Sequence, residues 1–144
     1  MSAGQGSAVG DPEATDLLQQ MIRNACVNDG TLESGHELRS VDLLQQYLGT
    51  SGIDVERFEP QPGRASLVAR IEGSDPDAPT LMLMGHTDVV PVNEDGWSRD
   101  PFSGDLDDGM VWGRGAIDML NLTASQAVAF RRLADSGFTP RGTL

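Results

Sequence analysis

The segment that most constrains the fold is the apolar run at residues 80–84, which is followed directly by Gly85, His86, Thr87 and Asp88. A strand with one solvated face alternates apolar and polar side chains, whereas this run is apolar on both faces. Such a pattern is typical of a central strand that is covered on both sides. The run therefore predicts a buried strand in an α/β layer fold.

The surrounding sequence predicts helices and further strands. Apolar residues recur at helical spacing from residues 11–13 onward, with a stripe formed by Leu17, Leu18, Met21, Ile22 and Ala25. A second helix follows residues 34–37, whose S-x-x-E spacing predicts a capping box, and a third follows Asp118 and ends at Gly137. Strands are predicted at residues 53–58 and 65–71, and residues 105–112 are predicted to form a hairpin that turns at Asp108 and Gly109. A further strand is predicted to begin at residues 142–144. Together these elements predict an α/β fold with a mixed sheet.

Length and charge narrow the function classes. The chain has 144 residues, which suits one domain, and a formal net charge of −12, which argues against nucleic acid and against a polybasic membrane anchor. No apolar run approaches the ~20 residues of a membrane-spanning helix. Residues 1–13 lack the features of a secretory signal and are expected to be a disordered leader, so a cytoplasmic location is expected. The single cysteine, Cys26, excludes an internal disulfide and predicts a buried, unreactive thiol.

His86 and Asp88 are the first candidate site residues. Residues two apart in an extended backbone point to the same side, so the imidazole and the carboxylate can share one face. In open α/β sheets functional sites gather at the carboxyl ends of strands. A metal bound by His86, with Asp88 orienting the ring, fits this arrangement, and a purely structural histidine is the alternative.

Residues 113–118, Gly-Arg-Gly-Ala-Ile-Asp, form the second candidate. Asp118 lies directly before the predicted third helix, so it is a candidate metal ligand, with an N-cap as the alternative interpretation. A dinucleotide-binding fingerprint is excluded because Asp118 stands where its third glycine would be. A calcium loop at residues 105–109 is excluded because its glycine falls at the fifth position, so its aspartates are expected in a solvated turn.

Three blocks in one order carry a family resemblance: residues 80–91, Trp97 with residues 100–102, and residues 113–119. Together they resemble the zinc-dependent exopeptidases and deacylases that include acetylornithine deacetylase, succinyl-diaminopimelate desuccinylase, aminoacylase and carboxypeptidase G. The resemblance runs from about residue 14 to the end of the chain. It implies that residues 14–144 are the amino-terminal portion of a truncated, three-layer catalytic domain with a mixed sheet, without the lid and dimerisation domain.

The resemblance also implies roles for the candidate residues. His86 matches a metal ligand of a two-zinc site, with Co²⁺ or Mn²⁺ as alternatives to Zn²⁺, and Asp118 matches the carboxylate that bridges the two metals. Asp88 matches the catalytic-site carboxylate that orients His86, and a cis peptide bond is expected between Asp118 and Met119. The implied reaction is attack of a zinc-activated water on an amide bond of an N-acyl amino acid or short peptide. No nucleic-acid or membrane partner is implied, and the oligomeric state stays open without the dimerisation domain.

The sequence departs from the family in its acidic residues. Family members place a Glu-Glu pair, which supplies the general base and a ligand, beyond the bridging aspartate. None of the seven glutamates here is adjacent to another, and Asp135 is the only acidic residue after Asp118. Zinc in a catalytic site usually has three protein ligands. We therefore expect the 144 residues alone to bind zinc poorly and to be inactive, with a non-catalytic metal-binding or interaction module as the alternative function.

Overall fold

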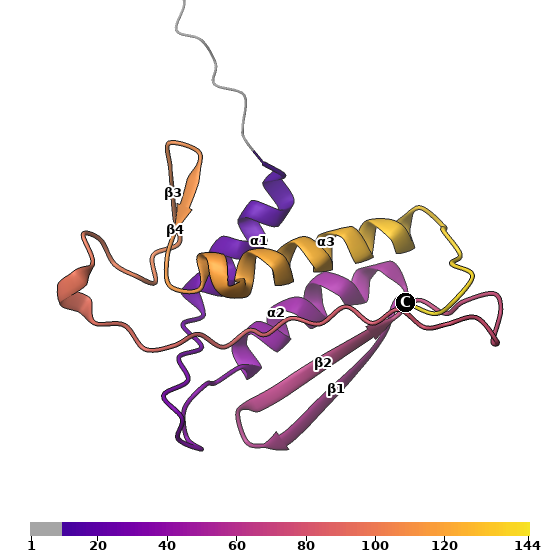
Figure 1. Cartoon of the computed structure of the whole chain (residues 1–144), viewed down its shortest axis with the longest axis horizontal. Coiled ribbons are helices and arrows are strands. Elements are labelled where there is room, and N and C mark those ends of the chain that lie inside the picture. Colours follow the sequence, from indigo (N-terminus) through magenta and orange to yellow (C-terminus); the bar gives the residue numbers. More distant parts are fainter. Residues whose placement is uncertain (1–9) are drawn as a thin grey trace, which may run out of the picture.

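Three helices form the body of the protein, and the computed structural model describes residues 10–144 (Figure 1). The helices are α1 (Pro12–Arg23), α2 (Leu38–Leu48) and α3 (Asn121–Asp135), with single turns η1 (Gly49–Ser51), η2 (Glu94–Gly96) and η3 (Ala116–Leu120). The strands form two separate antiparallel hairpins, β1 (Asp54–Gln61) with β2 (Arg64–Arg70) and β3 (Asp105–Asp107) with β4 (Met110–Trp112). Of the disordered leader expected at residues 1–13, residues 1–9 lie outside the described part, whereas Pro12 and Glu13 belong to α1. None of the described helices is long and apolar enough to cross a membrane.

The first helix forms where its sequence predicts it. The Asp11 carboxylate accepts hydrogen bonds from the backbone N–H groups of Glu13 (3.0 Å) and Ala14 (3.4 Å), and Pro12 occupies the first helical position. The predicted apolar stripe is buried at its four helical members, which are Leu17, Leu18, Met21 and Ile22. Ala25 lies beyond the helix in a left-handed conformation (φ 47°). The buried stripe packs against α3 and η3, and it forms the centre of the core.

The capping box predicted at residues 34–37 is wrong. The N-cap of α2 is Glu37, and no side chain caps this end of the helix. Gly35 (φ 93°) and His36 (φ 53°) both have left-handed backbone conformations, which turn the chain just before the helix. The Ser34 hydroxyl donates to the Thr31 carbonyl (3.0 Å) instead, and the buried Glu37 carboxylate lies 2.6 Å from Nε of Arg64 on β2.

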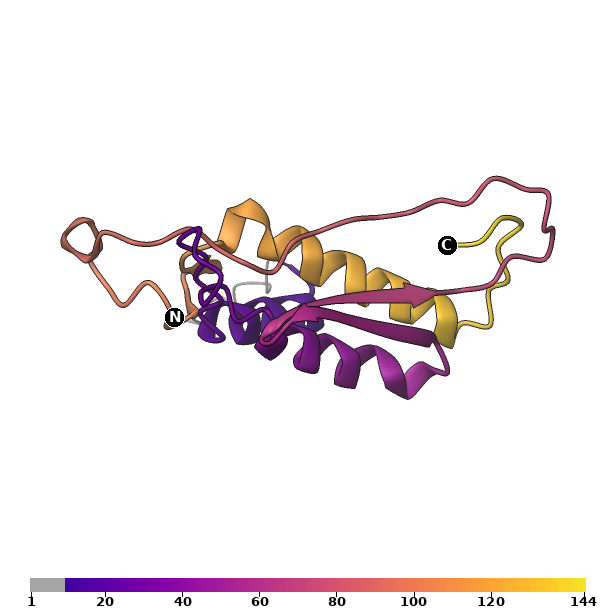
Figure 2. The same cartoon turned by 90° about the horizontal axis from the view of Figure 1, so that it is seen from below.

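The hairpin predicted at residues 105–112 is present, and the two strands predicted at residues 53–58 and 65–71 pair as a second hairpin. The β1–β2 register pairs Val55 with Ala69 and Arg57 with Leu67, and the chain turns at Pro62 and Gly63. The short β3–β4 hairpin turns at Asp108 and Gly109, as predicted. Figure 2 shows α2 lying along the β1–β2 hairpin, which brings β2 against the helical layer.

The run at residues 80–84 is extended but not the buried central strand that its sequence predicts. Leu81, Met82, Leu83 and Met84 expose between 55% and 72% of their surface. Among the described residues, its single backbone–backbone hydrogen bond runs from Leu81 N–H to the Thr143 carbonyl (2.9 Å). The burial prediction fails because a central strand needs neighbours on both edges, and neither β1–β2 nor β3–β4 pairs with this run.

The helices α1 and α3 are joined at the surface by Arg132. Its guanidinium pairs with the carboxylates of Asp11 and Glu13, the latter at 2.9 Å. The hydrogen bond from Arg132 lowers the pKa of Asp11 below its usual 3.8. The hydrogen bond from the Tyr47 hydroxyl (2.7 Å), assisted by Arg132, lowers the pKa of Glu13 below its usual 4.5. Because both pKa values fall on folding, the stabilisation is complete above about pH 5 and is lost as the pH falls through the lowered values.

We expect Arg132→Met to lower the melting temperature at pH 6, and we expect this difference from the wild type to shrink as the pH is lowered. At pH 6 the variant removes the cation that pairs with both carboxylates, whereas at acidic pH protonation of the carboxylates progressively abolishes those pairs in the wild type. Thermal unfolding followed by circular dichroism at several pH values measures the difference. Arg70→Met is the matched control, since Arg70 lies 3.9 Å from Asp54 and should show no such pH-dependent difference. A difference for Arg132→Met that does not shrink as the pH is lowered would contradict the assignment.

Candidate functional site

His86 lies between two carboxylates. Its Nδ1 atom is 3.2 Å from Oδ1 of Asp88, and its Nε2 atom is 3.3 Å from Oδ1 of Asp118. The Nδ1 atom is also 2.9 Å from the Asp88 carbonyl oxygen. The structure therefore brings together all three residues singled out in the sequence, although Asp118 is 32 positions from His86 along the chain.

The backbone around residues 86–89 is fixed on both sides. The buried Val89 forms a parallel β-bridge with Val27, donating to the Cys26 carbonyl (2.9 Å) and accepting from Asn28 N–H (2.8 Å). On the other side, the Thr123 hydroxyl of α3 donates to the His86 carbonyl (3.0 Å). These contacts hold His86 and Asp88 against α3 although residues 80–84 are exposed.

Asp118 is not the helix cap that the alternative interpretation suggested. The N-cap of α3 is Leu120, and no side chain donates or accepts a capping hydrogen bond there. The backbone at Asp118 (φ −120°, ψ 98°) is not helical, and the Asp118–Met119 peptide bond is cis, as the family resemblance implied. The Asp118 side chain is 90% exposed and faces the imidazole of His86.

Gly115 places the Asp118 loop close to the His86 segment. Its backbone is left-handed (φ 82°), and a Cβ atom there would lie 2.3 Å from Cγ1 of Val89 and 3.0 Å from Cδ1 of Leu120. Its carbonyl accepts a hydrogen bond from Leu120 N–H (3.0 Å). Only glycine combines this conformation with this close approach, so Gly115 helps to bring Asp118 to His86.

Asn28 was missed by the sequence analysis. Its Nδ2 donates to Oδ2 of Asp88 (2.8 Å), and its Oδ1 accepts from Gly30 N–H (3.0 Å). Asn28 thus holds the carboxylate that in turn contacts His86. The signal in the sequence was an Asn-Asp-Gly turn after the first helix, and nothing in it pairs Asn28 with a residue 60 positions further on.

The side chains of this cluster can supply some of the ligands of a metal site. With the proton of His86 on Nδ1, directed at Asp88, the lone pair on Nε2 faces Asp118. Imidazole nitrogen and carboxylate oxygen are both zinc ligands. Within residues 10–144 no group of three or more His, Cys, Asp or Glu side chains is placed to hold a metal ion. The described chain therefore supplies two facing ligand groups, which is fewer than a catalytic zinc usually has.

A cavity of about 480 Å³ adjoins these residues. Trp97, Trp112 and Arg114 contribute to its wall together with His86 and Asp118. The Arg114 guanidinium lies over the Trp97 ring, 5.5 Å from its centroid. The two tryptophans thus line the space beside the candidate ligands. A small molecule in this cavity would lie next to the imidazole.

Comparison with known proteins gives a consistent group of relatives. Residues 82–144, which include His86, Asp88 and Asp118, match the sequence profile of peptidase family M20/M25/M40. A succinyl-diaminopimelate desuccinylase of Parvibaculum lavamentivorans is 34% identical over 143 residues, which cover 96% of this chain and 34% of the relative. Aminoacylase-1 of Sus scrofa is 37% identical over 99 residues, covering 68% of this chain and 24% of the relative.

A solved structure shows the same fold. The crystal structure of human carnosine dipeptidase 1 matches with a TM-score of 0.69 and 25% sequence identity, covering 91% of this chain and 30% of that chain. The match confirms the predicted fold class. The chain spans about a third of the length of the full-length relatives that match most of it.

Proposed function

Because the chain belongs to peptidase family M20/M25/M40, we propose that it is part of a metal-dependent hydrolase that cleaves amide bonds in N-acyl amino acids or short peptides. The observation that carries the proposal is the position of His86 between Asp88 and Asp118. His86 and Asp118 would hold the metal, and residues 14–144 would form the amino-terminal portion of the catalytic domain.

The residues of this site have distinct parts in the proposal. Asp88 keeps the proton of His86 on Nδ1, so that Nε2 presents its lone pair towards Asp118. Asn28 holds the other oxygen of the Asp88 carboxylate and so limits rotation of that group. Asp118 has a largely exposed carboxylate with two oxygens, which is the donor type that can bridge two metals. A bound zinc ion would act as a Lewis acid and would lower the pKa of a coordinated water to about 7.

The described residues contain only part of the machinery that this reaction needs. Two facing ligand groups hold a zinc ion less firmly than three, and among the described residues no glutamate forms a hydrogen bond or ion pair with His86, Asp88 or Asp118. We propose that the further ligands and the general base come from residues outside these 144. The chain alone would then bind zinc weakly and leave an N-acyl amino acid intact.

Zinc titration of the chain and two variants tests this assignment. We expect weak zinc binding by the wild type and at least about a tenfold lower affinity for His86→Asn, because the variant removes one of two ligands. His36→Asn is the matched control: His36 is the other histidine, it is exposed, and asparagine tolerates its left-handed backbone. Isothermal titration calorimetry measures the affinities, and release of the amino acid from an N-acetyl amino acid measures activity.

Equal losses of affinity in the two variants would contradict the role of His86. Clear hydrolysis by the isolated chain would contradict the incomplete site. Unchanged zinc affinity in both variants would favour a non-catalytic interaction module, in which the His86 cluster is purely structural.

A further inference from the structure

Two stacked pairs of arginine and tryptophan join the loop before β3 to the β3–β4 hairpin. Each segment contains a tryptophan and, two residues later, an arginine: Trp97 and Arg99 in the loop, Trp112 and Arg114 at the end of the hairpin. The pairs are crossed. Arg99 lies over the Trp112 ring, 4.5 Å from its centroid, and Arg114 lies over the Trp97 ring at 5.5 Å. The second pair contributes to the wall of the 480 Å³ cavity beside the candidate metal ligands.

The stacked arginines differ in whether they also have an acidic partner. Arg99 lies 3.2 Å from the Asp107 carboxylate. Arg131, which lies over a tyrosine ring on α2, is likewise 3.6 Å from the carboxylate of Asp135. Among the described residues the Arg114 guanidinium forms no hydrogen bond or ion pair, and its Nε atom is buried without a partner. Arg114 therefore has the aromatic contact of the other two but lacks their carboxylate.

An arginine without a polar partner is an exception in this chain. The chain has ten arginines and 22 acidic residues. Within residues 10–144, each of the nine other arginines contacts a carboxylate or carbonyl oxygen. The one guanidinium that lacks such a contact is thus the one in the wall of the cavity beside His86.

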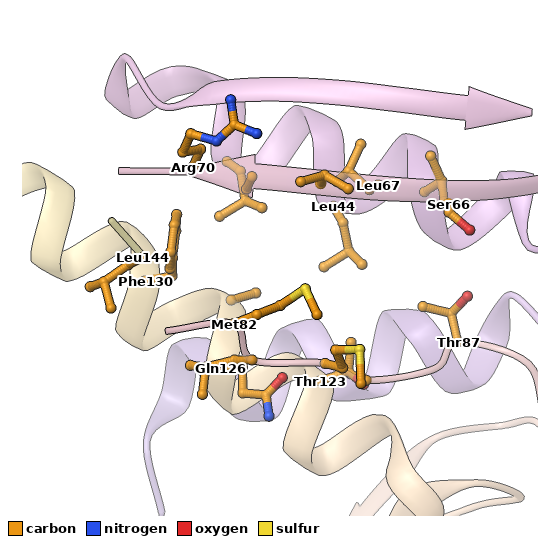
Figure 3. A pocket seen from close by; sticks show the side chains of 18 of the residues that line it. Leu44, Ser66, Leu67, Arg70, Met82, Thr87, Thr123, Gln126, Phe130 and Leu144 are labelled. Atoms are coloured by element: carbon orange, nitrogen blue, oxygen red, sulfur yellow. The ribbon is translucent and has the colours of Figure 1, made fainter. Parts of the chain in front are cut away.

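The larger cavity of the structure, about 760 Å³ between β2 and residues 80–87, has no comparable arginine in the described part of the chain. Arg64 in its wall lies 2.6 Å from the Glu37 carboxylate. Arg70 lies 3.9 Å from Asp54, and its guanidinium points away from the apolar side chains of the cavity (Figure 3). The unpaired cation therefore distinguishes the smaller cavity from the larger one.

Stacking on an indole leaves the donors of Arg114 able to bind an anion. The ring contacts the face of the guanidinium, whereas the N–H groups point outwards in its plane. Two parallel donors in that plane match the two oxygens of a carboxylate. The cavity wall also includes the apolar side chains of Val90, Met110 and Ile117. Its chemistry thus suits a carboxylate that is attached to an apolar group.

We propose that Arg114, stacked on Trp97, is the residue that binds a carboxylate of the substrate, while the apolar part of the substrate fills the cavity. The carboxylate would complete the Arg114 pair as Asp107 completes the pair at Arg99. Asp118 is the acidic residue of the cavity wall and repels a ligand carboxylate, which favours binding at the Arg114 side. The inference rests on the proposed function for its choice of an N-acyl amino acid, but the binding itself needs no metal.

Tryptophan fluorescence of the unmodified 144-residue chain tests the proposal, because its only two tryptophans both line the cavity. The probe is N-acetylphenylalanine, and the control is N-acetylphenylalaninamide, in which an uncharged amide replaces the carboxylate. EDTA in the buffer prevents binding of the carboxylate through a metal. We expect a saturable change with the acid and at least tenfold lower affinity for the amide, because charge-assisted hydrogen bonds are lost.

A third compound shows which end of the substrate carries the carboxylate. N-Succinylphenylalaninamide has its carboxylate on the acyl group instead of on the amino acid. Binding of N-acetylphenylalanine in preference to this compound assigns Arg114 to the amino-acid end, and the reverse preference assigns it to the acyl end. Either preference supports the proposal, provided that the uncharged amide binds at least tenfold more weakly than the preferred acid.

Two variants test the part of Arg114 directly. Arg114→Gln should weaken binding of the preferred acid at least tenfold and leave the affinity for the uncharged amide within about twofold. Arg99→Gln is the matched control, since Arg99 is also stacked on a tryptophan but already has Asp107 as its partner. Its affinity for the acid should stay within about twofold of the wild type. Circular dichroism checks that both variants fold, and if Arg114→Gln does not, the comparison of acid and amide on the wild type still decides.

Asp118→Asn separates this proposal from the metal assignment. In EDTA the variant should bind the acid at least as tightly as the wild type, because it removes a negative charge from the cavity wall. Its affinity for zinc should fall, because it removes a proposed ligand. Loss of zinc binding with retained acid binding is therefore the expected result, and each property can fail without the other.

Three results would overturn the proposal. The first is equal affinity of the wild type for all three compounds, which would show that the cavity binds apolar surface alone. The second is an equal loss of acid affinity in Arg114→Gln and Arg99→Gln, which would assign the effect to the stacked loop as a whole. The third is the absence of saturable binding by either acid.

Discussion

Replacing Gly115 with alanine is expected to lower the free energy of unfolding by about 3 kcal/mol. A left-handed backbone costs a residue with a Cβ atom roughly 1–2 kcal/mol, and forcing an extra carbon into a packed site typically costs about 1–3 kcal/mol more. Both apply here, because Gly115 has φ 82° and its Cβ would lie 2.3 Å from Cγ1 of Val89. Since small domains are stable by only about 5–15 kcal/mol, this is a large effect.

Gly109→Ala is the matched control for Gly115→Ala. Gly109 has nearly the same backbone (φ 76°), but no atom lies within 4 Å of its Cβ position. It should therefore show only the conformational cost, about 1 kcal/mol. Urea unfolding followed by circular dichroism compares the two variants. Equal losses would show that the close approach of Gly115 to Val89 does not determine stability. They would also contradict the role of Gly115 in placing Asp118 beside His86.

Leu120→Ala is expected to cost about 2–5 kcal/mol, the range for truncation of a buried leucine. Leu120 is 1% exposed and belongs to the main core cluster at the start of α3, two residues after Asp118. Truncating it leaves a cavity between α3 and the Gly115 loop. The loss should appear as a lower urea midpoint with an unchanged slope.

Leu122→Ala provides the comparison for Leu120→Ala, since Leu122 lies in the first turn of α3, two residues after Leu120, and is 51% exposed. Its expected cost is within about 0.5 kcal/mol, because a surface truncation leaves no cavity. If both variants lost the same stability, the burial of Leu120 would not explain the effect, because alanine is the better helix former at both positions.

The local elements could be predicted from the sequence because their causes are local. The stripe from Leu17 to Ile22, the Asp11-Pro12 helix start and the Asp108-Gly109 turn each fix structure within a few residues, and the structure has all three. The capping box failed because the backbone at Gly35 and His36 turns the chain before α2. Helical and turn patterns in a sequence do not reveal such left-handed positions when the residue is a histidine.

The candidate site could be predicted only in part. His86 and Asp88 are two residues apart, so their proximity follows from extended backbone, whereas Asp118 was placed by resemblance to a family. Asn28 was not found, because its hydrogen bond to Asp88 depends on the Val27–Val89 bridge between distant segments. The exposure of residues 81–84 was also not predictable, since burial of a strand depends on which partners lie beside it.

Opening of the β-bridge at Val89 can be followed by thiol labelling, because the partner segment contains the only cysteine of the chain. Cys26 is 1% exposed, its carbonyl accepts from Val89 N–H, and burial raises the pKa of its thiol. A thiol reagent can therefore react only when this segment opens. The labelling rate of the unmodified protein consequently measures, without any introduced probe, how often the Val27–Val89 bridge beside His86 and Asp88 opens.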